Sequence, residues 1–336
     1  MKLFGKDLGK DLVVVAEAGV NHEGSAAAAV KLVGLAKEAG ADAIKFQTYT
    51  PSRFVSSTRA ESLARVSKFR LDEKGHEQVI AEGKRLGIPV FSSAISDDVV
   101  PFLAANFQAI KIASGDVDFE PVIRAAARQG KPVLLSTGNA TLEEVDRAVG
   151  WVRVAIGGAP LEDRLVLLQC TSSYPAPIEE ANVATIPMLR ERYRVPVGFS
   201  NHVMGPEACL AAVALGACLL EVHFTDQKEG RTFRDHQLSM TAQELSSLIE
   251  TARLIRAALG SPEKSIQPSE RGHSLDIRKG LAAARDLTEG TILTDDDLSY
   301  ARPAIYFRSS QRGELIGRRL KRGLASGAVI TPDDLG

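Results

Sequence analysis

Eight apolar runs recur between residues 13 and 223, and each ends on or beside a polar residue. They span residues 13–18, 43–47, 89–93, 109–113, 132–136, 165–169, 196–200 and 217–223. Between them lie stretches whose apolar residues recur with a helical period, such as 26–39, 77–86, 142–154 and 242–259. This alternation of strand and helix predicts an α/β protein whose main domain is a (β/α)8 TIM barrel.

The polar residues at the ends of the eight runs are the candidates for chemistry, because barrel enzymes carry their active sites at the C-terminal ends of the strands. Lys45 and Lys111 end the second and fourth strands. A lysine in this position binds an anion or forms a Schiff base, and the sequence leaves both open.

Several serines occur near the same strand ends and would supply hydroxyl donors around the two lysines. They are Ser93, Ser114, Ser136, Ser172 and Ser200. Convergent ammonium and hydroxyl groups predict a binding site for a phosphate together with a carboxylate. Each serine taken singly is also an ordinary helix cap.

His202 and His223 lie at the ends of the seventh and eighth strands. Neighbouring strands are ~4.8 Å apart, so both imidazoles can converge on one metal ion. Two histidines leave coordination positions open for water or substrate and suit Mn, Co, Zn or Fe better than Ca. The alternative is a pair of histidines held by hydrogen bonds at a polar barrel mouth.

Glu17 ends the first strand, which pairs with the eighth when the barrel closes, so its carboxylate can reach a ligand near His223. Glu221 lies two residues before His223 on the same face, one layer deeper, where it would hold a lysine or orient a ligand. Asp235 and His236 follow the eighth strand in a long segment that either folds over the mouth or stays a solvated loop.

The strand and helix pattern lapses after residue 260 into Gly, Pro and Ser, which is typical of a linker. We expect a barrel domain over residues 1–262, a linker over 263–278 and a small β-rich domain over 279–336. The pattern of residues 286–298 recurs at 323–335, so this last domain contains an internal repeat. A domain this small buries little surface alone and is expected to pack on the barrel or on another subunit.

Composition excludes several classes of protein. The 336 residues carry a net charge of −1, with 44% hydrophobic and 25% charged residues, so no basic surface for nucleic acid is expected. No apolar run reaches the length of a signal peptide core or a membrane span, so we expect no membrane partner. Cys170, Cys209 and Cys218 have no metal-binding or disulfide spacing, which predicts buried reduced thiols and a cytoplasmic location.

Eight segments, in order, resemble the sialic acid (N-acetylneuraminate) synthase family. They are EAGVNHEGS at 17–25, KFQ at 45–47, KIASG at 111–115, STG at 136–138, CTSSYP at 170–175, SNH at 200–202, EVHFT at 221–225 and RDH at 234–236. The C-terminal domain resembles the family's antifreeze-like (SAF) domain, so the resemblance covers essentially the whole chain. It implies a metal-dependent enzyme that condenses phosphoenolpyruvate with an N-acetylmannosamine-type sugar and releases phosphate by C–O cleavage.

The resemblance also implies a role for each candidate residue. His202 and His223 would bind the divalent metal, usually manganese or magnesium, with cobalt also open. Phosphoenolpyruvate would be bound by Lys45, Ser93, Lys111, Ser114, Ser136, Ser172 and Ser200, and the sugar by Gln47, Tyr174 and Asp235. Glu17 would manage a proton or the attacking water. Arg302 would reach the sugar from the C-terminal domain of the other subunit, which implies a domain-exchanged homodimer.

The chain departs from the family pattern at a few positions, which leave the identity of the sugar open. Ala94 and Ile95 stand where Pro and Phe are common, Asn201 where Asp is usual, and Ala304 where Gly is usual. Two other functions stay open as alternatives. One is a Schiff-base aldolase that uses Lys45 or Lys111, and the other is a sugar-acid-binding protein without catalytic activity.

Overall fold

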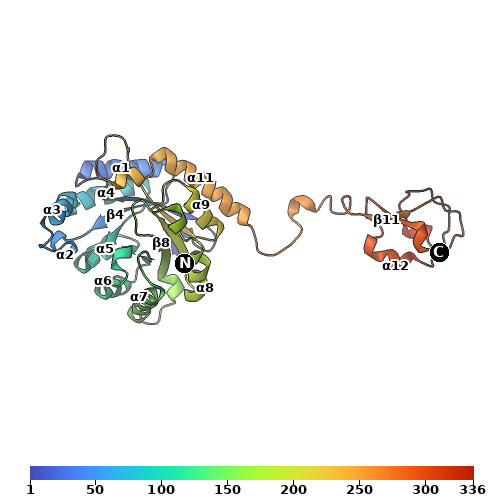
Figure 1. Cartoon of the computed structure of the whole chain (residues 1–336), viewed down its shortest axis with the longest axis horizontal. Coiled ribbons are helices and arrows are strands. Elements are labelled where there is room, and N and C mark those ends of the chain that lie inside the picture. The colour runs from blue at the N-terminus through green and yellow to red at the C-terminus, as the bar shows by residue number, and fades with distance from the viewer. The chain divides into compact units, whose positions relative to one another are not determined.

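The computed structural model describes all 336 residues, and its contacts divide the chain into two units, Met1–Gly260 and Ser261–Gly336. The first unit contains a closed barrel of eight parallel strands in the order β10-β3-β4-β5-β6-β7-β8-β9 (Figure 1). The strands are β3 (Val13–Gly19), β4 (Ala43–Thr48), β5 (Val90–Ala94), β6 (Ile110–Ile112), β7 (Val133–Ser136), β8 (Leu165–Cys170), β9 (Val197–Asn201) and β10 (Leu219–His223). The predicted TIM barrel is therefore confirmed.

Helices surround the barrel in a ring (Figure 1). One helix follows each strand: α1 (Ala26–Glu38), α4 (Glu73–Leu86), α5 (Val100–Asn106), α6 (Glu120–Ala127), α7 (Leu142–Ala155), α8 (Thr185–Tyr193), α9 (Glu207–Ala214) and α11 (Ala242–Leu259). The helix predicted over 77–86 begins earlier, at Glu73, because the Asp72 side chain accepts a hydrogen bond from the Gly75 amide and caps a polar first turn.

Two loops at the C-terminal ends of the strands are long enough to contain helices of their own. The segment after β4 contains α2 (Pro51–Phe54) and α3 (Ala60–Phe69), and the segment after β10 contains α10 (Asp235–Leu238). A short 3-10 helix, η2 (Ser114–Asp116), follows β6. Such loops commonly form the walls of a substrate site.

The hydrophobic core lies between the barrel and its helices and also fills the lower part of the barrel. All residues of β3, β6, β7, β8, β9 and β10 are buried, as expected for a parallel sheet that is covered on both faces. A hairpin of β1 (Lys2–Leu3) and β2 (Lys6–Asp7) adds Leu3 and Leu8 to this core.

The strand register decides which polar side chains meet. His223 on β10 pairs with Glu17 on β3, and Glu17 in turn pairs with Lys45 on β4. Ser93 on β5 pairs with Lys111 on β6. Because paired residues of a parallel sheet point to the same side, these groups share the inside of the barrel.

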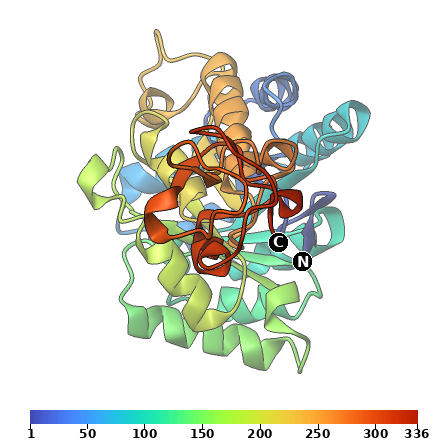
Figure 2. The same cartoon turned by 90° about the vertical axis from the view of Figure 1, so that its right-hand side faces the viewer.

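The second unit has its own small core around Leu281, Leu298 and Ile330, and an antiparallel pair, β11 (Gly280–Ala283) with β12 (Leu298–Ala301). It also holds the short helix α12 (Arg312–Leu315), and otherwise consists mostly of loops (Figure 2).

The internal repeat of the second unit recurs as structure. The Asp297 carboxylate accepts hydrogen bonds from the amide and the hydroxyl of Thr294, and its Oδ1 lies 2.6 Å from Arg285 Nη2. At the equivalent positions of the second copy, the Asp334 carboxylate accepts from Thr331 and pairs with Arg322. Both carboxylates are buried, so each copy of the repeat has a turn that is held by the same threonine–aspartate hydrogen bonds and the same arginine–aspartate ion pair.

None of the helices combines the length and the apolar content that crossing a membrane requires. The three cysteines are free and buried, as the sequence predicted.

Candidate active site

A polar cavity lies inside the barrel at the C-terminal ends of the strands. It is lined by Glu17, Lys45, Gln47, Ser93, Lys111, Ala113, Ser114, Ser136, Cys170, Tyr174, Ser200, His202, Glu221 and His223. We call it the inner cavity. Most of the residues predicted from the strand ends therefore meet around one space.

The two lysines of the inner cavity are fully buried but have different partners. Lys45 Nζ lies 2.8 Å from Glu17 Oε2 and 3.7 Å from Glu221 Oε1, and it donates to Ser93 Oγ at 2.8 Å. Lys111 Nζ donates to Ser136 Oγ and to the Ile112 carbonyl, both at 2.7 Å. Lys45 is thus neutralised by carboxylates, whereas Lys111 contacts only uncharged groups.

These surroundings shift the lysine pKa values in opposite directions. Burial lowers the pKa of Lys45, but the Glu17 and Glu221 carboxylates outweigh burial and raise it. Burial dominates at Lys111 and lowers its pKa. Lys111 therefore has no carboxylate in hydrogen-bonding contact, although the Glu221 charge acts on it, and an anionic ligand can take up that contact.

The two carboxylates of the inner cavity also differ. Burial raises the pKa of Glu17 to about 7, against the opposing effect of Lys45. Burial acts in the same direction on Glu221, but Lys45 and Lys111 outweigh it and lower its pKa, and Ser200 Oγ donates to Glu221 Oε1 at 3.1 Å. Glu221 is therefore the permanent anion of the pair, and Glu17 can exchange a proton near neutral pH.

Two of the hydroxyl groups that were predicted to bind an anion, those of Ser114 and Ser172, lie beside Gly138. Ser114 Oγ accepts from the Gly138 amide at 3.0 Å. A Cβ at Gly138 would lie 2.8 Å from Ser114 Oγ and 2.6 Å from Ser172 Oγ, so only glycine fits here. Ser172 itself is exposed and lies beside the lining of the inner cavity rather than in it.

The rings of His202 and His223 lie side by side at the mouth, with centroids 5.2 Å apart. His202 Nδ1 donates to the Thr171 carbonyl at 2.7 Å, so the Nε2 atom is the one available to a ligand. Burial lowers the pKa of His202, but its contacts with Cys170 and the Thr171 carbonyl outweigh burial and raise it, whereas burial lowers the pKa of His223 well below its ordinary value. The two imidazoles fit a divalent cation, which binds the deprotonated rings, although no third His, Cys, Asp or Glu joins them to complete a cluster.

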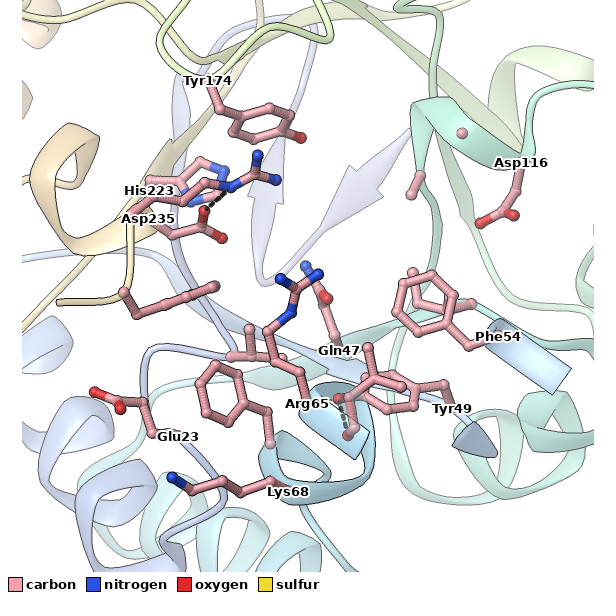
Figure 3. Close-up of a pocket in the computed structure, with 18 of the residues that line it drawn as sticks. Glu23, Gln47, Tyr49, Phe54, Arg65, Lys68, Asp116, Tyr174, His223 and Asp235 are labelled. Carbon is pink, nitrogen blue, oxygen red and sulfur yellow. Dashed lines mark hydrogen bonds and ion pairs between the residues drawn. The ribbon is translucent and has the colours of Figure 1, made fainter. Parts of the chain in front are cut away.

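A second, larger cavity of about 980 Å³ adjoins the inner one, and Gln47, Tyr174 and His223 line both. We call it the outer cavity. Its walls come from α2, α3 and the long segment after β10, as expected for the two long loops. Figure 3 shows Asp235, His223 and Tyr174 on one side of this cavity and Tyr49 and Phe54 on the other.

Asp235 lies on the wall of the outer cavity, at the start of α10. Burial raises its pKa, and Arg234 Nε donates to Asp235 Oδ1 at 3.3 Å. The Arg234 guanidinium lies 5.3 Å from the centre of the Tyr174 ring. The segment after β10 therefore folds over the mouth, which the sequence left open against a solvated loop.

Sequence reasoning missed Asp116 and Arg65, which also line the outer cavity. Asp116 ends η2, two residues after Ser114, and burial raises its pKa to about 6. Its position after a barrel strand was the available signal. Arg65 comes from α3, and Figure 3 shows its side chain reaching toward Gln47; nothing in the local pattern of α3 indicates this.

The departures from the family pattern have separate structural outcomes. The Asn201 side chain accepts from the Val203 amide at 3.1 Å and donates to the Val203 carbonyl at 2.9 Å, so its amide closes a turn beside His202. Ala94 is fully buried, and Ile95 lines the outer cavity. Arg302 and Ala304 belong to the second unit, where Arg302 is exposed and Ala304 is buried.

The fold and the site define an enzyme of the TIM-barrel class, with its site at the C-terminal ends of the strands. The sequence profile of the NeuB family matches residues 32–264, and that of the SAF domain matches residues 278–336. The chain therefore belongs to the NeuB family, and the predicted resemblance is confirmed.

Named relatives and solved structures agree with this assignment. N,N'-diacetyllegionaminic acid synthase of Legionella pneumophila is 33% identical over 334 residues, which cover 94% of this chain and 92% of that protein. Human N-acetylneuraminate-9-phosphate synthase is 33% identical over 303 residues, with 85% and 82% covered. The crystal structure of N-acetylneuraminic acid synthetase from Leptospira borgpetersenii has a TM-score of 0.74 and 30% identity, and covers 79% of this chain and 90% of its own.

Proposed function

We propose that the protein condenses phosphoenolpyruvate with the open-chain form of an N-acetylmannosamine-type aldose, giving a nonulosonic acid and inorganic phosphate. The observation that carries this proposal is the inner cavity, where two buried lysines, several hydroxyls and two histidines face one space beside the larger outer cavity. The names of the relatives, which are synthases of such acids, support the same reaction.

The donors of the inner cavity, whose volume is about 50 Å³, suit the charged groups of an anionic substrate. Two of the three N–H donors of Lys111 go to Ser136 and Ile112, and the third remains for an oxygen of phosphoenolpyruvate. Ser93 and Ser114 add hydroxyl donors to the same lining, which Ser200 joins with its proton directed to Glu221. A phosphate and a carboxylate require this kind of dense, convergent set of donors.

The histidine pair fits the divalent metal that the family uses. His202 and His223 would hold it through one ring nitrogen each, with manganese, magnesium or cobalt as candidates, and binding would displace the proton from a charged His202 ring. When bound, such a cation supplies Lewis acidity toward the aldehyde of the sugar.

The reaction then forms two bonds, one from C3 to the aldehyde carbon and one from C2 to a water oxygen, and breaks the C2–O bond to phosphate. C3 of phosphoenolpyruvate attacks the aldehyde carbon, and the cationic C2 that remains is captured by water. The C2–O bond to phosphate breaks, and phosphate leaves. Glu17 is the residue suited to accept the proton of the water, because its pKa of about 7 lets it ionise under working conditions. Lys111 balances the charge of the phosphate and carboxylate throughout.

The sugar fits the outer cavity, where Gln47, Tyr174 and Asp235 offer polar contacts next to His223. The acceptor is one of three aldoses: N-acetylmannosamine, its 6-phosphate, or a diacetamido-trideoxyhexose. The mixed lining of Phe54, Asp116 and other apolar and charged side chains accommodates each of them.

For assembly we propose a domain-exchanged homodimer in which the exposed Arg302 serves the site of the other subunit. The small size of the second unit, whose core consists of about ten buried side chains, supports this arrangement, because such a domain gains stability by packing on a partner. A cytoplasmic location fits the three free cysteines.

The test is phosphate release from phosphoenolpyruvate, measured with each of the three sugars and with Mn²⁺, Mg²⁺ or Co²⁺ after treatment with a chelator. We expect sugar-dependent release with at least one acceptor. Phosphoenolpyruvate labelled with ¹⁸O at the bridging oxygen should deliver the label to phosphate, which reports C–O cleavage. Covalent trapping of a keto-acid by borohydride at Lys45 or Lys111 would instead support a Schiff-base aldolase, and binding without phosphate release would support a binding protein.

A further inference from the structure

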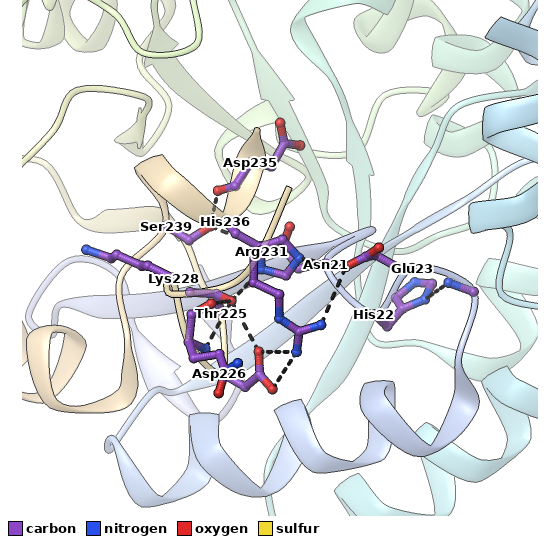
Figure 4. Close-up of polar contacts among 12 residues, drawn as sticks. Asn21, His22, Glu23, Thr225, Asp226, Lys228, Arg231, Asp235, His236 and Ser239 are labelled. Carbon is purple, nitrogen blue, oxygen red and sulfur yellow. Dashed lines mark hydrogen bonds and ion pairs between the residues drawn. The ribbon is translucent and has the colours of Figure 1, made fainter. Parts of the chain in front are cut away.

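A buried polar network joins the loop after β3 to the long segment after β10, outside the inner cavity (Figure 4). Thr225, His236 and Ser239 of the segment are fully buried, and Asn21 of the loop is nearly so. Polar side chains are rarely buried this completely unless hydrogen bonds hold them, so their partners decide what the network does.

The ring of His236 bridges the two elements. Its Nδ1 lies 2.6 Å from Thr225 Oγ1, and its Nε2 lies 3.2 Å from Glu23 Oε1. A carboxylate only accepts hydrogen bonds, so Nε2 carries the proton and donates to Glu23. The Thr225 hydroxyl has one proton for two acceptors, Nδ1 of this ring and the Gln227 carbonyl at 3.0 Å. Burial lowers the pKa of His236, in agreement with a neutral ring.

A second set of contacts fixes the backbone of Asp235. Ser239 Oγ donates to the Asp235 carbonyl at 2.6 Å. Asn21 Nδ2 in turn donates to Ser239 Oγ at 3.0 Å and to the Phe224 carbonyl at 2.8 Å. Asp235, on the wall of the outer cavity, is therefore held both through its own carbonyl and through the neighbouring ring of His236.

The loop after β3 is itself held in an unusual conformation. Glu23 has a φ of +49°, in the left-handed region that a non-glycine residue rarely adopts. Arg231 Nη1 lies 3.5 Å from Glu23 Oε1, and Arg231 Nη2 donates to both oxygens of Asp226 at 2.8 Å. Strain of this kind persists where the surroundings fix the residue, and it is concentrated at functional sites.

We propose that His236, through Glu23 and Thr225, is a positioning residue that sets the place of Asp235 for sugar binding. It acts through Asp235 and touches neither substrate, since its ring is fully buried and lines neither cavity. This inference rests on the proposed function, because it assumes that the sugar binds against Asp235 in the outer cavity. A displacement of a binding group by about 1 Å can cost ~100-fold in efficiency, even when the mutation lies far from the reacting atoms.

The test compares His236→Asn with His236→Gln in the full-length protein. The asparagine amide can replace Nδ1 toward Thr225 but cannot reach Glu23, whereas the glutamine amide can donate to Glu23 from near the Nε2 position. We expect His236→Asn to raise the KM of the sugar ~10- to 100-fold with the KM of phosphoenolpyruvate unchanged, and His236→Gln to restore most of the loss. Lys228→Ala is the matched control, because the Lys228 side chain pairs with Glu244 of α11 and makes no hydrogen bond to His236 or Asp235, and it should behave as wild type.

A double variant separates positioning from a merely structural role. If His236 acts through Asp235, His236→Asn should add little to the loss caused by Asp235→Asn, because the two effects share one path. If the losses of the two single variants multiply in the double variant, or if the KM values of the sugar and of phosphoenolpyruvate rise equally, the proposal is overturned. Thr225→Val, which removes the other partner of the ring, provides a second variant if His236→Asn folds poorly.

Amide hydrogen exchange tests the inference without turnover. His236→Asn should speed exchange in residues 225–240 and leave the barrel strands as in wild type, and unchanged exchange in that segment would refute the proposal. A wild-type protein that releases no phosphate with any acceptor would contradict the proposed function, while the exchange result would still decide whether His236 holds the segment.

Discussion

Replacing Lys111 with methionine should weaken phosphoenolpyruvate binding without destabilising the protein. Lys111 Nζ is buried, and its two protein partners, Ser136 Oγ and the Ile112 carbonyl, are uncharged. One N–H donor is left for the ligand. A charge-assisted hydrogen bond of this kind contributes ~1.5–3 kcal/mol, so the KM of phosphoenolpyruvate should rise ~10- to 150-fold.

The free energy of unfolding of Lys111→Met should be equal to that of the wild type or higher. Burial of the ammonium disfavours its charge, as the lowered pKa of Lys111 shows. Methionine has a similar shape and removes this cost, at the expense of two hydrogen bonds to neutral acceptors. Replacing a buried charge by a well-packed apolar side chain is commonly neutral or stabilising, so the free energy of unfolding should hold or increase.

Steady-state phosphate release, with each substrate varied in turn, and urea unfolding measure the two effects. Lys74→Met, on the exposed surface of α4, is the control for the loss of one positive charge and should leave both quantities as in wild type. A rise in the KM of the sugar alone would place the anion elsewhere. A loss of more than ~3 kcal/mol in unfolding free energy would make Lys111 a structural residue instead.

Three further predictions concern the remaining parts of the site. Because burial raises the pKa of Glu17 to about 7 and only the ionised form accepts a proton, kcat should rise with pH through about 7. Glu17→Gln should remove this rise and lower kcat ~100-fold or more. If kcat of the variant still rises with pH through about 7, this role is contradicted. His202→Ala or His223→Ala should abolish turnover and metal uptake while the melting temperature changes little, since these rings lie at the mouth above the apolar core; full wild-type activity after exhaustive chelation would exclude a metal. Co-expressed Arg302→Ala and Glu17→Gln chains should regain activity, because a mixed dimer contains one site with its own Glu17 and the other subunit's intact Arg302; activity equal to the sum of the separate variants would exclude the exchanged arrangement.

The linear pattern of the chain was enough to predict the barrel and the end of it that carries the site. Each strand is a short apolar run with a polar residue at its C-terminal end, and parallel strands bring those ends together whatever the details of packing. Glu17, Lys45, Lys111, His202 and His223 were found in this way. The internal repeat of the second unit was visible for a similar reason, because both copies carry the same capping residues at the same spacing.

The partners of these groups could not be read from the chain. Lys45 could pair with Glu17 or with Glu221, and only the register of β10, β3 and β4 places it within 2.8 Å of the first and 3.7 Å of the second. Burial raises the pKa of Glu17, whereas Lys45 and Lys111 outweigh burial at Glu221 and lower its pKa. These differences depend on distances and burial in three dimensions, which a one-dimensional pattern does not contain.

Loop residues were the least visible of all. Asp116 and Arg65 reach the outer cavity, and His236 meets Glu23, across long separations in sequence and without any repeating pattern. The strands that carry the inner site follow a strict alternation of inward and outward side chains, whereas each loop conformation is set by its own particular contacts. The sequence by itself therefore determined the barrel and the chemistry available at its mouth. The tertiary structure decided which charges are paired, which stay free for a ligand and what holds Asp235 in place at the outer cavity. Only closure of the barrel brings those groups within hydrogen-bonding distance and out of water.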